Sequence, residues 1–341
     1  MRIIPGSIPL RAKVSKNFLS LLQLLSGVAA LAFVGWHLTR IDTSLFSLQT
    51  IGPYGTALLL LCLALMMANW ALEARKWQLL AGLLEDISYF KALKGVLVGV
   101  SVGLITPRRS GEFAGRIMVL APANQLNGML LNMAASVSQL FVTLFMGSLG
   151  MAIFLFVLKG QWHDTPNGFS QSSLFFLIPG FLFSGLILLF AFGLPGMRFR
   201  FSPHHFIARA CNQCLDAFAL LSPLQVSTLL LLSLIRYGVF LLQFFLLLQI
   251  LGLSLPFSVF FTLTAMKYLV LTLFPLSAIW ELGIRGSVAI FVFGMYLPAQ
   301  EGWTLQILAA TASLWVINLA LPALAGGVSA LSHSFQNKSS A

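Results

Sequence analysis

The sequence predicts an all-α polytopic membrane protein with about six full spans and two broken or re-entrant helical hairpins related as an inverted repeat. Of its 341 residues, 58% are hydrophobic and 9% are charged, against about 25% charged in an ordinary soluble domain. Several apolar runs are long enough to cross about 30 Å of hydrocarbon. Two further apolar regions are interrupted by Pro-containing polar segments that resemble each other.

The apolar runs divide into uninterrupted and broken ones. The predicted spans are 18–38, 54–72, 127–158, 172–194, 224–250 and 303–325, and the broken regions are about 90–121 and 257–297. The longest polar stretch, 195–223, is too short for a separate domain and is predicted to form an amphipathic cytoplasmic connector. We therefore expect a single transmembrane domain over residues 1–341. The first run is interpreted as a retained helix, because no small-residue cleavage site follows it.

The net charge of +11 does not indicate nucleic-acid binding, because the basic residues lie at the ends of apolar runs, as the positive-inside rule expects. If each broken region enters and leaves the membrane on one side, only Arg40 and Lys159 are external. The cytoplasmic set is then Arg2, Arg11, Lys13, Lys16, Arg75, Lys76, Lys91, Lys94, Arg198, Arg200, Arg209 and Lys338. This topology places both termini in the cytoplasm, and we expect a bacterial cytoplasmic (inner) membrane location.

Length supports this treatment of the first broken region. Ala92–Ile105 has 14 residues and would extend only about 21 Å as a helix, which is too short to span the bilayer. Its return arm, Glu112–Ala121, is shorter still. We expect a re-entrant hairpin from the cytoplasm. The second broken region is either re-entrant or a pair of short spans, and both alternatives leave the topology unchanged.

The two interrupting segments share a Glu-x-x-x-Arg motif, with Glu five or six residues after a Pro. The motif residues are Pro107, Glu112 and Arg116 in the first segment, and Pro275, Glu281 and Arg285 in the second. Gly111 and Gly283 are the other predicted breaks. The preceding helices run in opposite directions in the predicted topology, so the repeats, about 54–158 and 224–325, form an inverted pair. Broken helices meeting near the midplane are typical of secondary transporters.

Charged residues at this depth are costly to keep, at about 2.5–3.5 kcal/mol each on insertion scales. Pairing of Glu and Arg at positions i and i+4 reduces that cost and is one complete explanation of the motifs. We favour a substrate site instead, because the two motifs converge and because Arg108 and Arg109 have no nearby acid. Arginine binds phosphate in bidentate fashion.

Other polar residues of the apolar runs are candidates for the same site. Arg236 and Lys267 are predicted to bind substrate. Asn132, Ser136, Gln139 and Thr143 lie at helical spacing and are predicted to line the cavity, with interhelical hydrogen bonding as the alternative. Gly95, Gly99 and Gly103 form a small-residue stripe that we assign to close helix packing.

No metal or cofactor site is expected. His204, His205, Cys211 and Cys214 lie within 11 residues, but structural zinc sites usually space two ligand pairs more widely. The sequence also contains no Gly-rich phosphate loop, nucleophile elbow or paired-carboxylate hydrolase arrangement.

The two motif segments resemble the transmembrane region of lysylphosphatidylglycerol synthase, a flippase-like family of integral membrane proteins. Pro107–Arg116 resembles the family's Pro-Gly-x-x-Gly-Glu-x-x-Arg segment, and Leu282–Arg285 resembles part of its second-half segment. The resemblance covers about 15–330. The family's second-half Glu follows the Arg, whereas Gly286 stands there in this chain. The soluble aminoacyl-transfer domain is expected to be absent, so the resemblance implies lipid translocation without aminoacylation.

The leading hypothesis is a lipid translocase, not an enzyme, that moves a phospholipid or polyprenyl-phosphate headgroup through a midplane cavity. Arg108, Arg109 or Arg285 would meet the phosphate, while Glu112 and Glu281 would hold those cations or a headgroup amine. The alternatives are a membrane-embedded transferase acting on a lipid-linked substrate and a non-catalytic assembly protein. The expected partner is a phosphate-bearing membrane lipid and not nucleic acid, with homo-oligomer formation left open.

Overall fold

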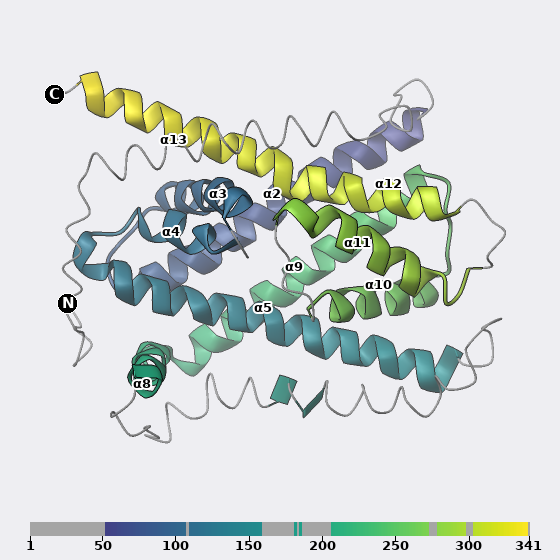
Figure 1. Ribbon diagram of the computed structural model, residues 1–341, viewed down its shortest axis with the longest axis horizontal. Helices are drawn as coiled ribbons and strands as arrows, with labels where there is room; N and C mark the ends of the chain where they lie inside the picture. Colours follow the sequence, from purple (N-terminus) through teal and green to yellow (C-terminus); the bar gives the residue numbers. More distant parts are fainter. Residues whose placement is uncertain are drawn as a thin grey trace.

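The computed structural model describes residues 52–106, 109–158, 181–182, 184–185, 206–272, 278–297 and 303–339. Of residues 157–158, 206–210, 278–280 and 331–339 it describes the backbone only. The elements discussed below are helices (Figure 1). The predicted spans 18–38 and 172–194 lie essentially outside the described residues, as do Pro107, Arg108 and Pro275.

The first half of the described chain contains a long helix, a helical hairpin and a second long helix. These are α2 (Pro53–Ala81), α3 (Tyr89–Ile105), α4 (Gly111–Ile117), the short η3 (Pro122–Asn124) and α5 (Gln125–Ile153), which continues as the π-helical η4 (Phe154–Leu158). Pro53 begins α2 at a position where a missing N–H costs nothing. The Ser88 side chain accepts a hydrogen bond from Lys91 N–H and caps α3.

The second half repeats the order of long helix, hairpin and long helix after a connecting helix. The elements are α8 (Phe206–Phe218), α9 (Pro223–Ile250), α10 (Phe257–Thr272), α11 (Ala278–Phe293), α12 (Trp303–Trp315), the π-helical η7 (Val316–Ala320) and α13 (Leu321–Ser339). Ser222 and Gln225 form a reciprocal capping box that starts α9. Helix α8 lies within the predicted connector and packs against α5.

Four helical stretches in the described part of the chain are long and apolar enough to cross a membrane. They are Pro53–Ala81, Pro122–Phe156, Pro223–Ile250 and Trp303–Ala330. Each coincides with a predicted span, and α10 adds a shorter apolar helix. The prediction of an all-α polytopic membrane protein is confirmed. The first of these helices continues to Ala81, beyond the predicted end at residue 72, and this extension carries charged residues into the interior.

The two hairpins lie at different ends of the molecule. Figure 1 shows α3 and α4 toward one end of the long helices and α10 and α11 toward the other. Helix α3 packs against α4, α13 and α2, whereas α10 packs against α5 and α11. Helices α2 and α9 pack together along the middle of the bundle. The charged motifs of both hairpins therefore flank a shared interior.

Glycines allow the first hairpin to close tightly. A methyl group on Gly115 of α4 would overlap the backbone of Gly99 on α3, and one on Gly103 would lie 2.5 Å from Glu112 Cγ. Side-chain-free positions let two helix backbones approach closely. The assignment of the α3 glycine stripe to close packing is thus confirmed.

One predicted break is wrong. Gly283 lies inside α11, which runs without interruption from Ala278 to Phe293, and a methyl group there would meet no atom within 4 Å. A single helical glycine lowers helix propensity by about 1 kcal/mol but does not by itself interrupt the hydrogen-bond ladder. Gly111, in contrast, is the first residue of α4 and donates its N–H to Thr106 Oγ1 at 2.8 Å, so it does lie at a break.

Candidate functional site

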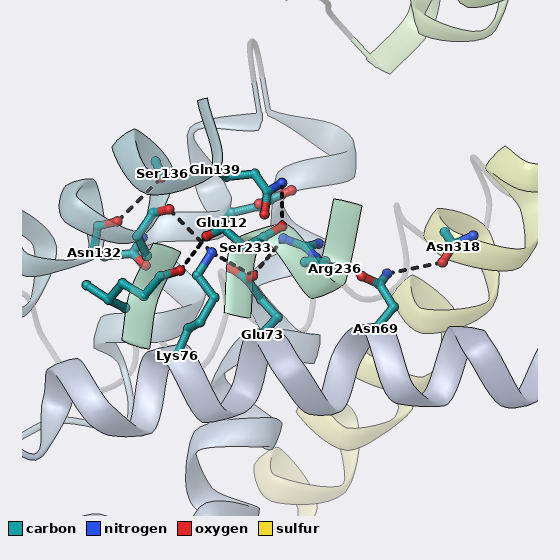
Figure 2. Close-up of polar contacts among 12 residues, drawn as sticks. Asn69, Glu73, Lys76, Glu112, Asn132, Ser136, Gln139, Ser233, Arg236 and Asn318 are labelled. Carbon is teal, nitrogen blue, oxygen red and sulfur yellow. Dashed lines mark hydrogen bonds and ion pairs between the residues drawn. The ribbon is translucent and has the colours of Figure 1, made fainter. Parts of the chain in front are cut away.

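The centre of the site is the carboxylate of Glu73 on α2. Its oxygens lie 2.6 Å from Arg236 NH1 on α9, 2.8 Å from Arg116 NH1 on α4 and 3.6 Å from Lys76 Nζ on α2. Glu73 and Lys76 are almost fully buried. Figure 2 shows Glu73 and Lys76 extending from α2 into the interior, where Arg236 approaches. Leaving any of these buried ions unpaired would be costly. The ion pairs of Glu73 therefore stabilise the packing of α2, α4 and α9 against one another.

The polar face of α2 extends from Glu73 in both directions. Asn69 accepts from Arg236 Nε at 2.7 Å and donates to Asn318 Oδ1 at 3.1 Å (Figure 2). Lys76 donates to the Ala135 carbonyl of α5 at 3.3 Å. Asn318, on η7, also donates to Gln243 Oε1 at 3.0 Å. Asn69, Glu73 and Lys76 are spaced four and three residues apart, so they lie on one face of α2. This polar face was not predicted from the sequence, because the predicted span ended at residue 72.

The first motif is joined to this centre through Arg116. Its NH2 lies 3.8 Å from Glu112 Oε2, which is the pairing within the motif that we considered as the alternative to a substrate site. Its NH1 also donates to Asn132 Oδ1 at 2.8 Å. The prediction that Arg109 has no nearby acid is wrong, because Arg109 pairs with Glu112 within the hairpin tip. The prediction failed because the chain turns after Arg109 to begin α4, and this turn places the Glu112 side chain next to Arg109.

The second motif pairs in the same way and meets the first. Glu281 Oε1 lies 2.7 Å from Arg285 NH2 and accepts from Arg285 Nε at 2.9 Å. Arg109 NH1 lies 3.6 Å from the same Glu281 oxygen. The predicted convergence of the two segments is therefore present at this contact. Arg109 makes it from a left-handed backbone conformation, with φ of 56°, which is uncommon for a residue with a side chain.

A cavity of about 340 Å³ opens beside this contact. Its charged lining residues, within the described ranges, are Arg109, Arg236, Lys267, Glu281 and Arg285. Trp70, Phe240, Leu271 and Leu314 are among the residues of its apolar wall. Among the described residues the cavity lining thus combines an excess of cationic groups with apolar surface.

Lys267 on α10 differs from the other cations. It is 2% exposed, and its Nζ lies 3.3 Å from the centroid of the Phe244 ring and 4.6 Å from that of Tyr268. No side chain that the structure describes forms an ion pair with it. Aromatic faces stabilise an ammonium ion by about 2 kcal/mol or more when desolvated. They supply no counter-charge, so a protonated Lys267 would face the cavity without a carboxylate partner among the described side chains.

The predicted substrate-binding and cavity-lining residues fall into two groups. Arg109, Arg236, Lys267, Glu281 and Arg285 line the cavity, as do Gln139 and Thr143. Glu112, Arg116 and Asn132 lie behind it in the ion-pair network. The prediction for Ser136 is wrong, because its side chain is exposed and its hydroxyl donates to the Asn132 carbonyl of its own helix. Gln139 also donates to the Ser233 carbonyl at 3.4 Å, so interhelical bonding and cavity lining coexist on this face.

A metal is not suggested by the residues described. No group of three or more His, Cys, Asp or Glu side chains gathers among them. Cys211 and Cys214 are unpaired thiols on α8, and His204 and His205 lie outside the described residues.

A comparison against protein families gives a match over most of the chain. The model of the lysylphosphatidylglycerol synthase TM region matches residues 20–320. The chain belongs to this family. The matched range includes both Glu-x-x-x-Arg segments and the helices around the cavity. Comparison with curated proteins and with solved structures gave no match.

Proposed function

We propose that this integral membrane protein is a lipid translocase that carries a phosphate-bearing headgroup across the bilayer through the central cavity. The observation that carries the proposal is the charge of the lining. In the described ranges, four cationic side chains and one carboxylate face a cavity that also has an apolar wall. A headgroup phosphate would offset this charge, while the acyl or prenyl chain stays against apolar surface.

The ion pairs supply a route for exchange of the headgroup. Arg285 and Arg109 share Glu281 Oε1, and both guanidiniums are partly exposed. An entering phosphate would join Glu281 as a partner of both guanidiniums, which can bind it in bidentate geometry. When the phosphate leaves, Glu281 remains their partner, so neither state contains unpaired guanidiniums or an unpaired buried carboxylate. The cost of moving a headgroup through the membrane core is reduced without a covalent step.

The predicted inverted relation of the two hairpins would complete the mechanism. Two hairpins that lie toward opposite ends of the molecule (Figure 1) could open access from each side in turn, as in transporters built from inverted repeats. Transport would be driven by an ion gradient or would run down the lipid gradient. Bond-making chemistry is not part of the proposal.

The test is lipid movement in proteoliposomes that contain the purified protein. Labelled lipids with phosphomonoester, phosphodiester and zwitterionic headgroups would be compared, with and without a proton gradient. We expect movement of an anionic lipid, and its loss in Arg285→Ala and Glu112→Gln. Arg75→Ala and Asp86→Asn alter exposed residues and should leave transport unchanged.

Failure to move any lipid, with correctly folded protein, would contradict the proposal. It would favour the transferase or the assembly function. Movement that persists unchanged in both Arg285→Ala and Glu112→Gln would assign transport to another route through the protein.

A further inference from the structure

The central cluster holds more cations than the ion pairs can balance. We define the central cluster as Glu73, Glu112 and the described Lys, Arg, Asp and Glu residues that line the cavity or contact either of these carboxylates. Its members are Glu73, Lys76, Arg109, Glu112, Arg116, Arg236, Lys267, Glu281 and Arg285. Six are cationic and three are acidic, so their net formal charge is +3. A single negative charge would leave most of this excess in place.

Within this cluster Lys267 is the cation that contacts none of the three carboxylates. Arg236 is opposed by Glu73, Arg109 by Glu112, and Arg285 by Glu281. Lys267 has aromatic rings but no carboxylate partner among the described side chains. The chain has only nine acidic residues in total. Because the described residues supply no counter-charge for Lys267, an anion that enters the cavity could supply it.

Hydrogen-bond donors without partners line the same cavity. The hydroxyls of Tyr237, Tyr268 and Thr311 are buried and have no hydrogen-bond partner within the described structure. The Tyr237 and Tyr268 rings lie in edge contact, with centroids 5.8 Å apart. A buried hydroxyl left unpaired costs about 1–3 kcal/mol. An anion with several acceptor oxygens would satisfy these donors and Lys267 together.

We infer that the cavity selects a headgroup with at least two negative charges, a phosphate monoester or a diphosphate, whose terminal phosphate contacts Lys267 and Arg285. This inference rests on the proposed function and narrows its substrate class. A terminal phosphate has three non-bridging oxygens, whereas a phosphodiester has two and only one charge. An aminoacylated headgroup, which adds cationic charge, is disfavoured by the same excess. The apolar wall beside the cations favours a lipid-linked phosphate over a free one.

Binding measurements on the whole protein in nanodiscs test the inference. The lipid probes are a prenyl diphosphate, a prenyl monophosphate and phosphatidylglycerol, and the soluble probes are pyrophosphate and inorganic phosphate at matched ionic strength. We expect the diphosphate and monophosphate lipids to bind at least about tenfold more tightly than phosphatidylglycerol. In Lys267→Met their dissociation constants should rise at least about tenfold, while Lys267→Arg should retain tight binding.

Lys91→Met is the matched control, because Lys91 is an exposed lysine that pairs with Glu85 outside the cavity. Its binding constants should equal those of the unaltered protein. Equal affinity for all lipid probes, or no effect of Lys267→Met in a protein with an unchanged melting temperature, would overturn the inference. Tight pyrophosphate binding without binding of the prenyl diphosphate would overturn the lipid assignment.

The two proposals fail separately. Transport of phosphatidylglycerol that is independent of Lys267 would support translocation and overturn the polyanion inference. Lys267-dependent binding of the prenyl diphosphate, with no transport of any lipid, would support the polyanion site and overturn translocation.

Discussion

The two helical hairpins use the same motif in different ways. In the first, α3–α4, Arg116 is buried between Glu73, Glu112 and Asn132, and the helices are locked together at Gly99 and Gly115. In the second, α10–α11, Arg285 has one carboxylate partner and faces the cavity. Lys267 on the same hairpin has no carboxylate partner among the described side chains.

The difference indicates that Glu-x-x-x-Arg spacing determines the ion pair within each helix. It does not determine whether the arginine is buried in the network or faces the cavity. What distinguishes the hairpins is the supply of acids from neighbouring helices. Glu73 of α2 reaches the first hairpin, whereas the described residues supply no equivalent carboxylate to the second. We therefore interpret the first hairpin mainly as structural support and the second as the main phosphate-contacting surface, with Arg109 linking them.

The largest effect is expected from Glu73→Gln, which removes the carboxylate that opposes Lys76, Arg116 and Arg236. Breaking a buried ion pair by removing one partner costs about 3–5 kcal/mol, so the variant should lose a large part of its resistance to thermal unfolding in detergent. Asp86→Asn is the control, because Asp86 is exposed. An unchanged melting temperature for Glu73→Gln would remove Glu73 from the centre of the structural network.

Gly115→Ala tests the tight closure of the first hairpin. The added methyl group overlaps the Gly99 backbone, so α4 must shift, at about 1–3 kcal/mol. Gly238→Ala on α9 introduces the same group where it meets no atom within 4 Å, and should stabilise the helix by about 0.5–1 kcal/mol. Chemical unfolding of both variants measures the contrast, and equal shifts would contradict the packing explanation.

Arg109→Gln tests the link between the hairpins. Glu112 keeps Arg116 and Glu281 keeps Arg285, so the fold should survive. Transport should fall about tenfold, equivalent to about 1.4 kcal/mol, because the shared cation between the two motifs is lost. Arg75→Gln changes an exposed arginine and serves as the control. A large loss of stability with unchanged transport per folded molecule would reverse this assignment.

The smallest effect is expected from Gln243→Leu. Gln243 donates to the Cys62 carbonyl at 2.9 Å and accepts from Asn318 at 3.0 Å, which joins α9 to α2 and η7. Interhelical hydrogen bonds in membranes average about 0.6 kcal/mol each, and the variant loses two of them, so its stability should fall by about 1.2 kcal/mol. Gln249→Leu, near the end of α9, is the comparison. A loss above about 2 kcal/mol would show that this bond is part of the central network.

The long helices and the two interruptions could be predicted from the sequence because apolar length and charge placement act locally. The pairing of Glu281 with Arg285 followed from helical spacing alone. The partner of Arg109 could not be predicted in this way, because it depends on the direction in which the chain returns after the break.

The role of Glu73 was missed for a related reason. A hydropathy boundary treats a charge at the end of an apolar run as an interfacial residue, and Lys76 was assigned to the cytoplasmic side on that ground. In the structure α2 continues to Ala81, and these charges are buried because Arg236 and Arg116 arrive from helices far away in sequence. A hydropathy profile contains no information on partners from distant parts of the sequence, so it could not predict that Glu73 and Lys76 are buried.

The carboxylate of Glu73 also has a consequence for biogenesis. Helix α2 is synthesised before α4 and α9, and at that stage Glu73 has Lys76, three residues away on the same helix, as its counter-ion. Arg236 follows 163 residues later, and an arginine at the centre of an inserting helix costs about 2.5–3.5 kcal/mol. The carboxylate of Glu73, already in the membrane, would offset part of that cost by pairing with Arg236. The first half, once inserted, would therefore lower the cost of inserting Arg236 by providing its carboxylate partner. A second half translated alone would bring Arg236 into the bilayer without Glu73.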